Sequence, residues 1–110
     1  MLGPAPYRPF GADRMEPLPV YATWWGEVGR CVGSGSADFG RIRWFSVPGQ
    51  AFDTPDHGLA LGRWVPPHDI YLAEARIDSE DVVKHEMVHD RLHGGEADDP
   101  RFRLCSGIGH

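Results

Sequence analysis

Apolar side chains recur at helical spacing in two stretches of the chain. In residues 18–32 they stand three or four positions apart, and a similar period returns in the stretch of residues 80–95. Between these stretches, residues 41–47, 59–65 and 69–73 are short, apolar and bounded by proline, glycine or charged residues, which predicts three strands. The order of helix, three strands and helix, without internal repeats, predicts one α+β domain.

The remaining segments are predicted to lack a helical or strand period. Residues 1–17 form an extended, proline-rich segment, because five prolines fall within the first nineteen positions. Tyr7 and Phe10 are its candidates for contact with the domain. Residues 50–58 are a turn-rich loop. The domain itself is therefore predicted to span residues 18–110.

The second helical stretch carries the sequence His85-Glu86-Met87-Val88-His89, an HExxH pattern. Two histidines four positions apart lie on one helix face, so their ring nitrogens can converge on one Zn²⁺. Glu86 lies beside that face, within reach of a water that the metal would bind. The pattern predicts metal-assisted hydrolysis. The alternative is that both histidines are ordinary core or surface groups.

Local signals favour a helix around this pattern. Asp78 or Ser79 can cap its N-terminus. Glu80 and Asp81 place negative charge in its first turn, and a glycine pair beginning at Gly94 ends it. Apolar side chains on two sides indicate that the helix is mostly buried.

Charge and hydropathy narrow the classes of partner. The formal net charge is -5 and no basic stripe appears, which argues against nucleic acid. No apolar run approaches the length of a membrane span, and residues 1–20 lack the apolar core of a signal peptide. Neither a nucleic-acid partner nor a membrane span is therefore expected.

Cys31 and Cys105 lie far apart and lack the spacing of metal ligands. A disulfide between them would tie the C-terminal tail to the first helix and imply an oxidising compartment, secreted or periplasmic. Two free thiols would instead indicate a cytoplasmic protein. The small size of the domain favours the disulfide, which the chain-entropy model values at about 4 kcal/mol.

The element order, with HEMVH on the last helix, resembles the N-terminal half of the zincin metallopeptidases over about residues 18–105. The resemblance implies a backing helix, a small twisted three-stranded sheet, an active-site helix and a short C-terminal tail. It also implies that His85 and His89 bind one Zn²⁺ per chain and that Glu86 polarises a water. A strand within residues 59–73 would pair with the substrate, a peptide or unfolded protein.

A zincin needs a third protein ligand, and here the chain departs from the commonest patterns. Leu92 stands where the metzincin form has glycine, and Glu96 follows too closely for a gluzincin ligand. His93 lies one turn further along the helix, and three residues on successive turns span about 12 Å, too far for one ion. Asp99 is the first candidate and Asp98 the second, where compact zincins carry a histidine. An ordinary acidic turn is the alternative.

The donor that would stabilise an oxyanion is open among Tyr71, His68, Arg101 and His110, of which Tyr71 and His68 are the first candidates. Two other functions also remain open. One is a non-catalytic, zinc-stabilised module that binds a peptide or protein. The other is an intracellular zinc protease domain cut from a larger regulator, which free cysteines would favour.

Overall fold

The computed structural model describes residues 8–33, 38–55, 58–94 and 99–106. Its helices are α1 (Pro19–Val32), α2 (Glu80–Leu92) and α3 (Pro100–Cys105), with short 3-10 turns at Phe39–Arg41 and Glu74–Arg76. Its strands are β1 (Asp13–Met15), β2 (Arg43–Val47), β3 (Phe52–Thr54), β4 (Gly58–Ala60), β5 (Gly62–Val65) and β6 (Asp69–Ala73). The α+β class is confirmed. None of the helices in the described ranges is long and apolar enough to cross a membrane.

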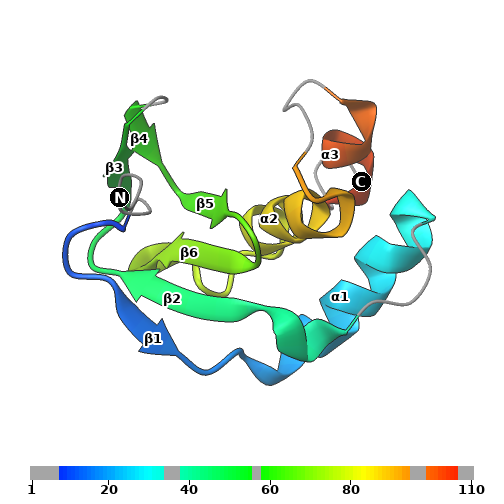
Figure 1. Cartoon of the computed structure of the whole chain (residues 1–110), viewed down its shortest axis with the longest axis horizontal. Coiled ribbons are helices and arrows are strands. Elements are labelled where there is room, and N and C mark those ends of the chain that lie inside the picture. Colours follow the sequence, from blue (N-terminus) through cyan, green and yellow to red (C-terminus); the bar gives the residue numbers. More distant parts are fainter. Residues whose placement is uncertain (1–7, 34–37, 56–57, 95–98, 107–110) are drawn as a thin grey trace, which may run out of the picture.

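The main sheet has four strands instead of the predicted three, in the order β1-β2-β6-β5, and β3 and β4 form a separate pair (Figure 1). Strands β2 and β6 are parallel at its centre, whereas β1 and β5 run antiparallel to their neighbours at the two edges. The sequence predicted one strand over residues 59–65, but the chain changes partner at Leu61. Up to Ala60 it pairs with β3, and from Gly62 it pairs with β6.

The N-terminal segment contains regular structure, contrary to the prediction. Its strand β1 extends the sheet beside β2. Ala12 is buried, and the guanidinium of Arg8 lies 5.3 Å from the ring centroid of Phe45. Phe10 is fully exposed and therefore does not hold the segment, while Tyr7 lies outside the described residues. A proline-rich segment can still supply a short edge strand, because an edge needs fewer backbone donors.

Side chains that alternate along β2 and β6 divide the core into two parts. Trp44, Ile70 and Leu72 face the helices, in one cluster with the apolar residues of α1 and α2. Phe45 and Tyr71 face the opposite way, in a second cluster with residues of β3. The helices therefore cover one face of the sheet. Figure 1 shows α2 between the edge strand β5 and α3, both of which it contacts.

Helix α1 is the backing helix that the sequence predicted. Trp24 and Trp25 are buried in its interface, as expected for core residues. The guanidinium of Arg91, from α2, lies 4.0 Å from the ring centroid of Trp25. A Cβ on Gly29 would meet that guanidinium at 2.4 Å. The absence of a side chain at this position therefore leaves room for the guanidinium of Arg91 against α1.

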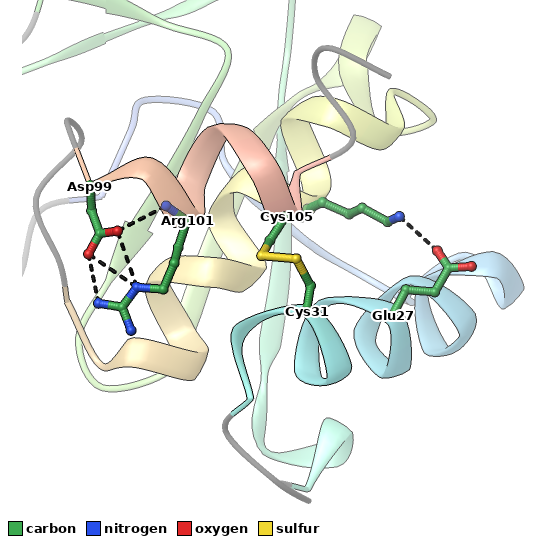
Figure 2. The surroundings of a disulfide bond; sticks show 6 residues. Glu27, Cys31, Asp99, Arg101 and Cys105 are labelled. Carbon is green, nitrogen blue, oxygen red and sulfur yellow. Dashed lines mark hydrogen bonds and ion pairs between the residues drawn. A yellow bond between two sulfur atoms is a disulfide. The ribbon is translucent and has the colours of Figure 1, made fainter.

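A disulfide joins Cys31, near the end of α1, to Cys105, at the end of α3 (Figure 2). This confirms the bond that the size of the domain favoured. Helix α3 has only 6 residues, too few to be stable alone, and it is held by the disulfide and by the buried ring of Phe102. Helix α3 is thereby fixed against both longer helices.

Replacing Cys31 and Cys105 together by serine is expected to lower the free energy of unfolding by about 4 kcal/mol, because the bond closes a long loop in the unfolded chain. Urea denaturation in oxidising buffer measures the change. A reducing agent should shift the wild-type midpoint to that of the double variant and leave the variant unmoved. A wild-type midpoint that ignores the reductant would contradict the prediction.

Candidate functional site

Helix α2 carries the HExxH pattern, and its N-terminus and C-terminus end in different ways. Ser79 occupies the N-cap position, but its side chain makes no capping hydrogen bond. At the other end His93, with φ 55°, takes the left-handed conformation that usually selects glycine. The N–H of Gly94 then donates to the carbonyl of His89 at 2.9 Å. The chain therefore turns sharply one residue before the predicted glycine pair.

The two histidines of the pattern lie together, with ring centroids 5.2 Å apart. Nδ1 of His89 lies 2.8 Å from the carbonyl of Gly94, which only accepts, so Nδ1 carries the proton and Nε2 keeps its lone pair. The ring of Phe102 packs against His85 and His89, at 4.9 and 4.4 Å between centroids. Both imidazoles are thus oriented and partly covered.

Burial keeps both histidines neutral near pH 7. It lowers the pKa of His85 to about 4, with a further contribution from the charge of His89. Burial also lowers the pKa of His89, although the hydrogen bond to Gly94 opposes the change. Neutral imidazole is the form that binds a metal ion.

Glu86 is buried against the edge strand β5. A Cβ on Gly62 would lie 3.1 Å from Cγ and 3.2 Å from Oε2 of Glu86, so glycine leaves the space that this carboxyl occupies. Burial raises the pKa of Glu86 to about 8, while the backbone N–H of Trp64 and the charge of Arg63 oppose the rise. The group is therefore set to exchange a proton close to neutral pH.

A pocket of about 290 Å³ opens beside Glu86. Helix α2 and the start of β5 supply its walls, which are formed by Leu61, Gly62, Asp81, Val82, His85 and Glu86. The first histidine and the glutamate of the pattern are therefore reached from one hollow in the surface.

Asp90, which follows the second histidine, is a fully buried residue that the sequence reasoning missed. Its carboxylate accepts from Nε of Arg41 at 2.8 Å and from Nε1 of Trp64 at 3.0 Å, and it lies 3.0 Å from Nδ1 of His68. The indole of Trp64 is nearly parallel to the ring of His89, at 8° and 6.1 Å between centroids. Asp90 thus holds Trp64 beside the histidine.

The expected oxyanion donors lie away from the pocket. Tyr71 is buried on the other face of the sheet, with its ring stacked on Phe45 at 4.6 Å. His68 is bonded to Asp90. Neither is among the residues that line the pocket. His110 lies outside the described residues.

Asp99, the expected third ligand, serves as the N-cap of α3. Its carboxylate accepts from the backbone N–H of Arg101 at 2.9 Å and from the guanidinium at 2.7 Å (Figure 2). The side chain and backbone of Arg101 hold the pKa of Asp99 at about 2. Asp98 lies outside the described residues. Across the described ranges, no group of three or more His, Cys, Asp or Glu side chains is arranged to hold a metal ion.

Comparisons with known proteins found no matching family model, no matching curated protein and no matching solved structure. Together with the missing three-residue group in the described ranges, this overturns the assignment to the zincin metallopeptidases with an aspartate as third ligand. The physical reason lies at Asp99, whose carboxylate caps the N-terminus of α3 and accepts hydrogen bonds from the backbone and side chain of Arg101.

Glu86→Gln is expected to stabilise the metal-free protein at alkaline pH. With its pKa raised from 4.5 to about 8, the native carboxyl holds a proton that the unfolded chain releases, so wild-type stability falls as pH rises through that window. The gain near pH 8 is on the order of 4 kcal/mol, less the cost of burying an amide. Below the unfolded pKa the advantage should vanish.

Thermal unfolding of metal-free protein across this pH range measures the effect. Glu16→Gln, at an exposed position, is the matched control and should follow the wild type. A constant difference between wild type and Glu86→Gln at every pH would contradict the buried carboxyl.

Proposed function

We propose that this protein is a zinc-dependent hydrolase that cleaves peptide bonds, with His85 and His89 holding the metal and Glu86 acting as general base. One observation carries the proposal: His85, in contact with a second neutral imidazole on His89, lines a pocket together with the buried carboxyl of Glu86 at the edge of the sheet. This function is proposed from the residues around α2 and not from a likeness to a known peptidase family.

The histidine pair fits a zinc ion in its chemistry. Imidazole nitrogen is a ligand that zinc favours, and the carbonyl of Gly94 leaves Nε2 of His89 available to it. Phe102 limits the rotation of both rings. Bound zinc would supply a Lewis acid that lowers the pKa of a water and polarises a carbonyl. Within the described ranges no third protein donor joins the pair.

Glu86 suits the role of a base that takes a proton and returns it. Its pKa of about 8 lies close to neutral pH, where proton transfer in both directions is efficient. A cation held by the histidines would lower this pKa and favour the carboxylate. The carboxylate would then accept a proton from the attacking water and donate it to the leaving amine. The N–H of Trp64 keeps it at the strand edge.

The edge strand β5 offers a place for an extended substrate. The N–H of Ala73 donates to the carbonyl of Leu61, so the alternation of an antiparallel pair directs the backbone groups of Gly62 and Trp64 away from β6. The N–H of Trp64 bonds to Glu86, which leaves the backbone of Gly62 and the carbonyl of Trp64 for a substrate. A polypeptide that adds to such an edge exposes its own backbone beside Glu86. An unfolded segment meets this requirement, whereas a folded protein buries its backbone.

The disulfide fits an oxidising compartment, which favours a secreted or periplasmic protein over a cytoplasmic one. Unfolded polypeptide is a substrate that such a compartment can supply. The proposed activity and the proposed location are therefore compatible.

The metal part of the proposal predicts one zinc per chain. Metal analysis of protein that has been stripped and reloaded should find one ion in the wild type and none in His85→Ala or His89→Ala. His68→Gln should keep the ion, because His68 lies against Asp90 instead of the pair. A wild type that retains no zinc would remove the basis of the proposed function.

The catalytic part predicts that Glu86→Gln retains zinc but loses at least about 100-fold in the hydrolysis of an unfolded protein, because general-base catalysis contributes that much or more. Mass spectrometry of a reduced, alkylated substrate measures the cleavage. Glu16→Gln makes the same charge change at a distant exposed position and should cleave as the wild type does. Zinc binding without turnover in the wild type would instead identify a non-catalytic zinc module.

A further inference from the structure

We infer that the pocket beside Glu86 receives a lysine or arginine side chain of an extended polypeptide, with Asp81 as the group that selects the positive charge. The inference deepens the proposed function, because it rests on a polypeptide lying along the edge of β5. It assigns a role to residues that the hydrolytic chemistry leaves unused.

The pocket has the size and walls for one long side chain. At about 290 Å³ it is just below the range for small-molecule sites, which begins at roughly 300 Å³. Leu61 and Val82 supply apolar walls, and Leu61 is 39% exposed. Gly62 adds no side chain between them. An aliphatic stem can lie against such a surface while its charged end stays at the mouth.

Asp81 gives the pocket its charge. It lies in the first turn of α2, is exposed, and lines the pocket. Its neighbour Glu80 is committed to Lys84 at 2.7 Å, as is Glu27 from α1. Among the ion pairs of the described residues, none involves Asp81. A cationic end is therefore complementary to the one first-turn carboxylate that lines the pocket.

The neighbouring cation does not contradict this assignment. Arg63 follows Gly62 in β5, and successive residues of a strand point to opposite faces. Gly62 lies opposite Leu72, which faces the helices, whereas Arg63 lies opposite Tyr71, which faces the other cluster. Arg63 accordingly does not line the pocket.

Three peptides that differ at one position test the inference. An unstructured, dye-labelled host peptide carries lysine, norleucine or glutamate, and fluorescence anisotropy measures its binding to metal-free wild-type protein at low salt. Norleucine keeps the stem of lysine without the charge. For an exposed pair, lysine should bind about 3-fold more tightly than norleucine and about 10-fold more tightly than glutamate. High salt should remove both differences.

Two substitutions with the same change in net charge separate the pocket from the general charge of the protein. Asp81→Asn should abolish the preference for lysine over norleucine and leave the affinity for norleucine unchanged. Asp13→Asn lies on β1, which is the edge strand opposite β5, and this variant should keep the preference. Equal binding of all three peptides, or an equal loss in both variants, would overturn the inference.

Failure of the inference and failure of the proposed function give different results, because this binding test needs neither zinc nor turnover. A preference for lysine that depends on Asp81, in a protein without activity, would retain the pocket and reject the hydrolase. Turnover with zinc but without this preference would retain the hydrolase and reject the pocket.

Discussion

The buried carboxylate of Asp90 determines how helix α2 packs against the sheet. The carboxylate of Asp90 is fully buried, and removing a carboxylate from water costs several kcal/mol unless partners compensate it. Its partners come from three separate segments, Arg41 before β2, Trp64 in β5 and His68 before β6. A different rotation of α2 would leave this charge without them. The position of Glu86 beside the edge strand therefore follows from where Asp90 must lie.

The long elements of the fold were predictable because each carries a full period with clear stops. Helices α1 and α2 and strand β6 have bounds within about one residue of those read from the sequence. Strands β1 and β3, the break between β4 and β5 and helix α3 were missed. Strands of three or four residues and a helix of less than two turns contain too little periodicity, so the tertiary partner decides their conformation.

Site residues were also predictable only where a local sequence period determines their position. Helical spacing alone brings His85 and His89 together, since four residues return to one face. Asp99 shows the limit of pattern, because an aspartate before a proline caps a helix as readily as it binds a metal. Asp90 and Trp64 carry no local signal. Their roles emerge only when it is known that β5 is the strand packed against α2.

The disulfide also affects the order in which the molecule matures. Helix α3 places the ring of Phe102 over both imidazoles, yet it is short and is anchored through Cys105 to α1. In a newly synthesised chain, whose thiols are still reduced, the sheet and the two longer helices can assemble by burial alone. The disulfide then adds to the burial of Phe102 in holding this cover over the histidines. Formation of the bond between Cys31 and Cys105 is then the step that completes this face of the protein.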